Sequence, residues 1–232
     1  MDTVQKKIDY FNVIFSKIKN QEISFAMYQS GFCHTLYQLV QEYPKCLPFQ
    51  KSLIESSLKK SVDFITSYLI PIDFSENNYH IVPIKVLYPN LLKANKKNCY
   101  QEGDLQIALL LFRISFVLKD GDLFHLANMI ASFSKMRENE DLHETMSIDF
   151  KTGTIGVALL YQTIFFLTGL RYYKNQSEYW YLKSKNIQTN LSESLTGVEL
   201  SDHHETQRAF EAFENPQNDT WRKLYFLEYD IA

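Results

Sequence analysis

Three segments of the chain are similar to one another, and in each a glycine precedes an apolar stretch. The glycines are Gly103, Gly153 and Gly197, spaced 50 and 44 residues apart in a 232-residue chain that has only seven glycines. Residues 107–110 are Ile-Ala-Leu-Leu, and residues 157–160 are Val-Ala-Leu-Leu. Self-similarity at such a period is typical of repeat proteins, in which one helical hairpin cannot bury its apolar face alone. The sequence therefore predicts stacked helical hairpins, in either an open solenoid or a closed ring.

The distribution of apolar residues predicts which helix of each hairpin lies inside. Residues 105–112 are apolar almost all round, so we expect a helix that is buried on most sides. Residues 123–136 place their apolar side chains on one face, which is typical of an outer helix. A glycine at the start of an inner helix lets neighbouring backbones approach closely. Gly153 should therefore lie in a crowded centre, and Gly121 in an exposed turn.

Three more helices are predicted ahead of these repeats. Residues 4–18 carry apolar side chains at a 3.6-residue rhythm. Helices over 25–42 and 49–69 are expected to stop before Pro44 and Pro71, because the residue before a proline disfavours helical geometry.

The chain is predicted to form one all-α domain over residues 1–232, because no linker-like stretch divides it. This domain comprises N-terminal helices over 1–70, an irregular insertion over 71–99 and three helical-hairpin repeats over 100–232. The insertion holds no helical period, and a connection of this length is either a functional lid or a trace of lost structure. Hydrophobic residues make up 45% and aromatic residues 15% of the chain, which suits a folded protein.

Charge and hydropathy argue against two classes of partner. A net charge of −3 and a pI near 6.1 give no basic field for gathering nucleic acid. The longest apolar run, 107–118, is broken by Arg113 and Ser115 and is too short for a membrane span. The N-terminus lacks a signal-peptide pattern, and an odd number of widely spaced cysteines fits reduced thiols, so a cytoplasmic location is expected. These cysteines are Cys33, Cys46 and Cys99.

Longer motifs surround the first two repeat glycines. Residues 100–109 are Tyr-Gln-Glu-Gly-Asp-Leu-Gln-Ile-Ala-Leu, and residues 151–158 are Lys-Thr-Gly-Thr-Ile-Gly-Val-Ala. The first resembles the Trp-Cys-Tyr-Gly-Asp-x-Gly-Ile-Ala-Leu segment, and the second the Cys-His-Gly-x-Ala-Gly-Ile-Ala segment, of the lanthionine synthetase C-like (LanC-like) family. Residues 221–224, Trp-Arg-Lys-Leu, are similar to that family's closing helix. The resemblance implies an α/α toroid-like fold, and a smaller number of hairpins than in the family implies a shortened or incomplete ring.

The same resemblance bears on the chemistry. In that family, a zinc ion held by the cysteine of the first segment and the Cys-His pair of the second activates a peptide thiol for addition to a dehydrated Ser or Thr. The matching positions of this chain hold Gln101, Lys151 and Thr152. Zinc prefers thiolate, imidazole or carboxylate ligands, and an amide, an ammonium and a hydroxyl group replace them poorly. The resemblance therefore implies the fold without the metal, and no cofactor is expected.

Other residues could supply zinc ligands in an alternative arrangement. Cys99 lies two positions before Gln101, so a small shift in register would return one thiolate to the site. Cys33 and His34 are adjacent on a predicted helix, where neighbouring side chains point about 100° apart and converge poorly on one ion. Zinc is expected only under this alternative.

The densest group of ligand-type residues is Asp202-His203-His204-Glu205, near the expected end of the third inner helix. It lacks the His-Glu-x-x-His spacing that puts two imidazoles on one helical face. We therefore favour a solvated helix end or turn over a metal or acid–base site. The aromatic residues of 172–181 are interpreted as packing of an outer helix, with a docking surface as the alternative.

No complete catalytic motif is present, so the leading hypothesis is not enzymatic. We expect a LanC-like protein without an intact zinc site, acting as an accessory or scaffold that binds a peptide or a partner enzyme during modification of ribosomally made peptides. One alternative is an active lanthionine cyclase-type enzyme, forming carbon–sulfur bonds with other ligands. The second alternative is a helical-repeat adaptor for protein interactions.

Either self-association into a homo-oligomer or an exposed apolar seam for a partner is a further expectation. The apolar stripe of the first helix, which includes Phe11 and Phe15, needs a covering surface. A C-terminal helix over 221–229 or a second chain is expected to provide it.

Overall fold

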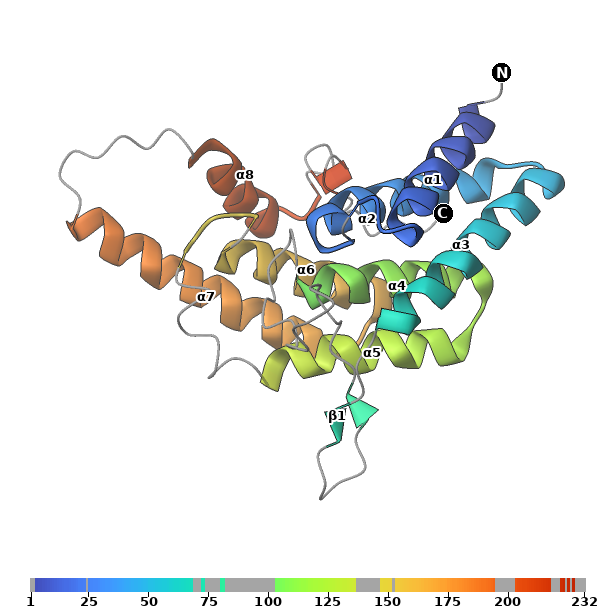
Figure 1. Cartoon of the computed structure of the whole chain (residues 1–232). Helices are drawn as coiled ribbons and strands as arrows, with labels where there is room; N and C mark the ends of the chain where they lie inside the picture. The colour runs from blue at the N-terminus through green and yellow to red at the C-terminus, as the bar shows by residue number, and fades with distance from the viewer. Residues whose placement is uncertain are drawn as a thin grey trace. The chain divides into compact units, whose positions relative to one another are not determined.

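The chain is all-α, as its sequence predicts. The computed structural model describes residues 3–23, 25–68, 72–73, 80–81, 103–136, 147–151, 153–194, 203–217, 222–223, 225 and 227. In order, the elements are α1 (Thr3–Lys19), α2 (Phe25–Glu42), the 3₁₀ helix η1 (Tyr43–Lys45), α3 (Pro48–Tyr68), β1 (Ile72–Asp73), β2 (His80–Ile81), α4 (Asp104–Leu118), α5 (Gly121–Met136), α6 (Thr154–Thr168), α7 (Arg171–Ser194) and α8 (His203–Glu214) (Figure 1). Within the described residues, the two strands of two residues each are the only extended elements. None of the described helices has both the length and the apolar character needed to cross a lipid bilayer.

The elements divide between two compact units. The N-terminal unit comprises Met1–Asn95 and Ile107–Phe133, and it holds α1 to α3 with most of α4 and α5. The C-terminal unit comprises Lys96–Gln106 and Ser134–Ile231, and it holds α6, α7 and α8. The single domain expected from the sequence remains a prediction.

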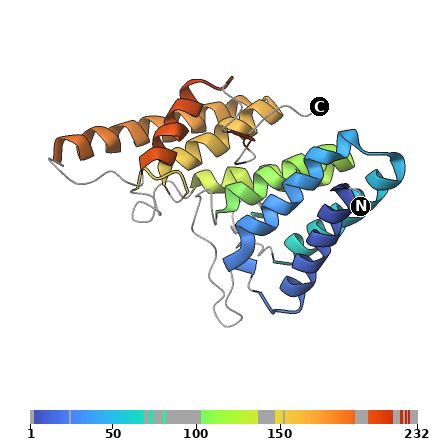
Figure 2. The same ribbon diagram turned by 90° about the horizontal axis from the view of Figure 1, so that it is seen from above.

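The phenylalanines of α1 pack against the two helices that follow it. Helix α1 lies beside α2 and α3 (Figure 2). The ring of Phe11 lies 6.2 Å from that of Phe32 on α2, and the ring of Phe15 lies 5.5 Å from that of Phe64 on α3. Phe11 is fully buried. The apolar stripe is thus covered within its own unit, so the expectation that a C-terminal helix or a second chain covers it is wrong. Periodicity shows that a stripe exists but does not identify the helix that covers it.

Polar and aromatic contacts complete the N-terminal unit. Lys7 of α1 forms a 2.7 Å ion pair with Glu42 at the end of α2. The buried guanidinium of Arg113 on α4 lies 5.2 Å from the centre of the Tyr37 ring on α2, which is a cation–π contact. Helix α5 packs on α4, because the ring of Phe124 lies 5.0 Å from that of Phe112.

The expected distinction between inner and outer helices is observed. Residues 104–115 of α4 and 154–164 of α6 are all buried, whereas α5 and α7 bury only some of their side chains. On α7, Tyr173 and Trp180 are buried and Tyr179 is exposed. Two of the aromatic residues of 172–181 therefore serve the packing of an outer helix, as predicted.

The third repeat is described only from His203 onward. The apolar helix expected after Gly197 lies outside the described residues, and α8 begins at His203. The ligand-type cluster therefore lies at the start of a helix rather than at the end of one. Helix α8 is amphipathic, with Ala209 and Phe210 buried and exposed polar residues between its buried positions.

The C-terminal helix expected over 221–229 is also corrected. Arg222 and Lys223 are helical, but Tyr225 lies in a turn and Leu227 in irregular structure. The amides of Tyr225 and Leu227 both donate to the carbonyl oxygen of Arg222, at 3.1 and 2.9 Å. Two hydrogen bonds to one carbonyl close a turn and end the helix.

The described part of the 71–99 insertion is an antiparallel pair of strands. Ile72 of β1 pairs with Ile81 of β2, and Asp73 pairs with His80. The remainder of the insertion lies outside the described residues. The sequence predicted irregular structure here and did not predict this pairing.

Candidate functional site

The loop before α6 positions the best candidate site, and Gly153 determines its shape. The amide of Gly153 donates to Asp149 O at 2.8 Å, and the amide of Thr154 donates to Ser147 O at 2.9 Å. A Cβ atom on Gly153 would lie 2.3 Å from Ser147 O and 2.5 Å from Asp149 N. Glycine is therefore required by the close approach of the loop's own backbone. The sequence predicted crowding at this position, but between neighbouring inner helices rather than within the loop. This tight turn places Lys151 beside α8.

Lys151 forms an ion pair with Glu205 in the first turn of α8. The distance between Lys151 Nζ and Glu205 Oε2 is 2.8 Å, and both side chains are partly exposed. The other carboxylate oxygen of Glu205 accepts a 2.8 Å hydrogen bond from the hydroxyl of Tyr225. The Tyr225 ring packs edge-on against Phe150, with 4.7 Å between the ring centres. This Lys151–Glu205–Tyr225 cluster joins the 147–151 loop, α8 and the 222–227 segment.

The pKa values show which protonation states the cluster favours. The pKa of Glu205 is lowered, first by the hydrogen bond from Lys151 and also by the one from Tyr225. The pKa of Tyr225 is raised to about 12, first by burial and then by its hydrogen bond to Glu205. At neutral pH the carboxylate is charged and the tyrosine keeps its proton. Because both pKa values move away from neutrality, neither group is suited to general acid–base catalysis.

Lys151 does not fit the zinc site that the family resemblance implies. A lysine ammonium has three donors and no lone pair, and this one is already paired with Glu205. Gln101, Thr152 and the alternative ligand Cys99 lie outside the described residues. Over the part of the chain that the structure describes, no three His, Cys, Asp or Glu residues come close enough to hold a metal ion.

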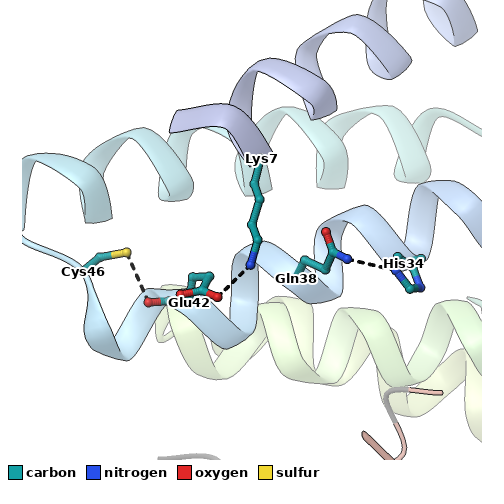
Figure 3. Close-up of polar contacts among 5 residues, drawn as sticks. All are labelled: Lys7, His34, Gln38, Glu42 and Cys46. Carbon is teal, nitrogen blue, oxygen red and sulfur yellow. Dashed lines mark hydrogen bonds and ion pairs between the residues drawn. The ribbon is translucent and has the colours of Figure 1, made fainter. Parts of the chain in front are cut away.

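The structure keeps Cys33 and His34 apart, as their adjacent positions on a helix predict. Cys33 is fully buried, and burial raises the pKa of its thiol. His34 lies on the outer side of α2, with its Nε2 atom 3.0 Å from Gln38 Nε2, and partial desolvation lowers its pKa. Figure 3 shows three polar contacts of α2. Gln38 contacts His34, Lys7 pairs with Glu42, and the thiol of Cys46 donates to the carbonyl oxygen of Glu42. These contacts stabilise α2, and the side chains do not converge on a common metal site.

The two histidines singled out by sequence lie at the start of α8. His203 is the first residue of α8, and His204 is exposed to solvent beside it. Their neighbour Glu205 is the residue that reaches the 147–151 loop. The first turn of a helix favours a carboxylate over an imidazolium, which is a signal that could have identified Glu205.

Arg222 is a further important residue that sequence reasoning did not identify. It is fully buried, and its Nη2 atom donates to Gln162 Oε1 of α6 and to Ala212 O at 2.8 Å. Its Nη1 atom donates to Leu227 O at 3.3 Å. Gln162 in turn donates to Phe213 O at 3.1 Å. Arg222 and Gln162 thus bind carbonyl groups in the last turn of α8, where a cation also interacts favourably with the helix dipole.

A second cluster of the same composition holds the other end of α8. Glu214, the last residue of the helix, pairs with Lys185 of α7 at 2.9 Å and accepts a hydrogen bond from the hydroxyl of Tyr181. The Tyr181 ring stacks on that of Phe213, with 4.2 Å between the ring centres. A lysine, a glutamate and a tyrosine therefore fix each end of α8 to its surroundings.

The described site thus presents an ion pair, a tyrosine–carboxylate hydrogen bond and a buried arginine around α6 and α8. A comparison of the chain with models of protein families, with curated proteins and with solved structures found no match.

Proposed function

We propose that this chain is a LanC-like protein without an intact zinc site, which acts as an accessory or scaffold in the modification of ribosomally made peptides. In this role it binds the peptide, or the enzyme that modifies it, and forms no covalent bond itself. The observation that carries the proposal is the ion pair of Lys151 with Glu205, at the position where the resembled family has a zinc-binding cysteine.

The chemistry of the Lys151–Glu205–Tyr225 cluster supports a role without catalysis. Activation of a thiol near neutral pH needs a metal, a nearby cation or a base of suitable pKa. Lys151 is the cation of this cluster, and Glu205 already neutralises it. The pKa of Glu205 is lowered and that of Tyr225 is raised, so neither residue would take up the thiol proton readily at pH 7.

The same cluster also supports a binding role, because it helps to fix the position of α8. It connects the start of α8 to the loop before α6, and the Glu214–Lys185 pair connects its other end to α7. Rigid elements present a binding surface with less loss of conformational entropy than mobile ones. The part of the proposal that names a modified peptide rests on the family resemblance.

A binding and chemistry assay on the full chain tests the proposal. The probe is a synthetic Ser/Thr/Cys-rich peptide with one free cysteine, in its dehydrated form and with a fluorescent label. We expect its anisotropy to rise on binding, whereas the count of free thiols, measured by alkylation and mass spectrometry, stays constant with added zinc. A loss of one thiol per peptide would instead support the cyclase alternative. Absence of binding to the peptide and to its modifying enzyme would leave the adaptor alternative.

A further inference from the structure

The turn between α2 and α3 exposes three large apolar side chains close together. The exposed fractions are 60% for Leu47, 62% for Phe49 and 42% for Leu53. Leu47 directly precedes α3, and Phe49 and Leu53 lie one helical turn apart on the same face of it. Figures 1 and 2 both show this turn at one end of the group formed by α1, α2 and α3. Exposed apolar residues scattered singly are ordinary, whereas a group of them marks an interaction surface.

The start of α3 departs from the usual preferences of a helix. The carbonyl oxygen of Leu47 accepts a 2.9 Å hydrogen bond from the amide of Lys51, so Leu47 is the N-cap of α3. The Leu47 amide donates to Gln50 Oε1 at 2.8 Å, which fixes the residue in this place. Serine, threonine, aspartate and asparagine are preferred at an N-cap, leucine is among the poorest, and no acidic residue lies in the first turn. Departures of this kind are typical of functional sites.

Two lysines flank the apolar side chains. Lys45 is exposed and Lys51 is partly exposed, and none of the ion pairs of the described residues involves either of them. The carboxylates closest to them in sequence are engaged elsewhere. Glu42 pairs with a lysine of α1 at 2.7 Å (Figure 3), and Glu55 accepts a hydrogen bond from the hydroxyl of Tyr43. The surface here is therefore both apolar and positively charged. We call it the α3 tip, and it consists of Lys45, Leu47, Phe49, Lys51 and Leu53.

We propose that the α3 tip binds the surface of an anionic lipid bilayer. Leu47, Phe49 and Leu53 enter the boundary between headgroups and acyl chains, while Lys45 and Lys51 lie at the level of the lipid phosphates. Peripheral proteins bind bilayers by this combination of buried apolar area and attraction to anionic lipids. The inference goes beyond the proposed function and does not rest on it, because peptide binding is measured without lipid.

The exposure of the apolar side chains favours a bilayer over a protein partner. Side chains that line a groove are mostly covered by its walls, whereas Leu47 and Phe49 are more than half exposed and project from the surface. A bilayer accepts a projecting side chain without a matching pocket. The two lysines have the charge opposite to that of phosphatidylserine, so insertion and electrostatic attraction act together.

Flotation of the purified full chain with lipid vesicles tests the inference. One set of vesicles is phosphatidylcholine alone, and the other contains about 30% phosphatidylserine. We expect binding to the anionic vesicles to be at least about tenfold tighter, since each lysine near an anionic surface contributes roughly fivefold. Salt at about 1 M should reduce this difference, because it shortens the Debye length to roughly 3 Å.

Substitution of Leu47 separates binding from folding. Leu47→Ser should weaken binding to the anionic vesicles at least about fivefold, because an inserted side chain is lost. Serine is the better N-cap, so the thermal unfolding midpoint should stay the same or rise. Leu182 of α7 is 61% exposed, and Leu182→Ser is the matched control, which should change binding less than about twofold.

Charge reversal tests the lysines in the same assay. Lys45→Glu should weaken binding to the anionic vesicles at least about tenfold. Lys19→Glu makes the same change in net charge at an exposed residue, about 18 Å further along α1 than the lysine that pairs with Glu42. This distance exceeds the Debye length, so Lys19→Glu should change binding less than about twofold.

Fluorescence tests insertion directly. Phe49→Trp adds a tryptophan to the α3 tip, and its emission should shift to shorter wavelength when anionic vesicles are added. Leu182→Trp, at a position of similar exposure, should show no such shift.

Three results would overturn the inference. The first is a full chain that does not float with the anionic vesicles. The second is binding that Leu47→Ser and Leu182→Ser weaken equally, because the α3 tip would then have no special part in it. The third is a chain that self-associates without binding vesicles and becomes monomeric on Phe49→Ser, which would make the α3 tip a contact between copies.

Discussion

The hydroxyl of Tyr225 donates a 2.8 Å hydrogen bond to the carboxylate of Glu205, twenty residues before it in the chain. The same carboxylate pairs with Lys151 through its other oxygen. Glu205 therefore joins the loop before α6, the first turn of α8 and the 222–227 segment. By the family resemblance, Lys151 matches a metal-binding cysteine, and in this chain it forms an ion pair instead.

The stability that Glu205 provides should depend on pH in the acid range. Its pKa lies below the ordinary value of 4.5 in the folded protein, so its contribution is present above pH 4.5 and is lost as the pH falls through the lowered value. The pair is partly exposed, and we expect Glu205→Gln to lower the free energy of unfolding by about 0.5 kcal/mol at pH 7. Denaturant titrations from pH 7 downwards should show this difference at pH 7 and its loss as the pH falls through the lowered pKa of Glu205. Glu178→Gln, in the exposed 3.7 Å pair with Lys174, is the control and should have a smaller effect.

Tyr225 should titrate at unusually high pH. Because its pKa is raised from 10.0 to about 12, the stability it adds is complete below pH 10 and is lost as the pH rises from 10 towards 12. Tyr225→Phe should remove one tyrosinate step with a midpoint near pH 12 from the ultraviolet titration of the folded protein. A missing step near pH 10 instead would mean that the hydroxyl is free in solution and does not bind Glu205.

Gly153→Ala should destabilise the protein far more than Gly121→Ala. The new Cβ atom at Gly153 would collide with the backbone of Ser147 and Asp149, whereas nothing lies within 4 Å of the one at Gly121. We expect a loss of roughly 1–3 kcal/mol for the first substitution and a change within about 0.5 kcal/mol for the second. Thermal unfolding measures both. Equal losses would show that the turn before α6 is not close-packed.

Loss of the Arg222 guanidinium should be among the most damaging single changes. Arg222→Met leaves Gln162, Ala212 O and Leu227 O without their buried donor, at a cost of about 3 kcal/mol. The neighbouring Lys223 is exposed, and Lys223→Met is the control with little effect. In a double-mutant cycle, Arg222→Met and Gln162→Leu should be coupled by at least about 0.5 kcal/mol. Additive effects would mean that the two side chains do not interact.

Much of the fold follows from local patterns in the sequence. The bounds of α1, α2 and α3 agree with their predicted ranges to within a residue or two, because apolar rhythm and proline positions are local signals. The burial of α4 and α6 follows in the same way from stretches that are apolar all round.

The candidate site could be predicted only in part, because it depends on contacts between distant residues. The sequence directed attention to Lys151 through the family motif and to His203 and His204 through their composition. It gave no sign that Glu205 would meet Lys151, 54 positions away, or that Arg222 would be buried against Gln162. A buried arginine looks like a surface residue in sequence, since its acceptors include the carbonyl groups of α8, which carry no sequence signature.

The central claim is that the ion pair of Lys151 and Glu205 stands where the resembled family binds zinc. Elemental analysis of the purified full chain, after mild dialysis against a zinc-containing buffer and then a zinc-free one, tests it most directly. We predict a zinc content well below one ion per chain, with no change on Lys151→Ala or Cys99→Ala. About one zinc ion per chain, lost when Cys99 is replaced, would contradict the claim and support an active enzyme with other ligands.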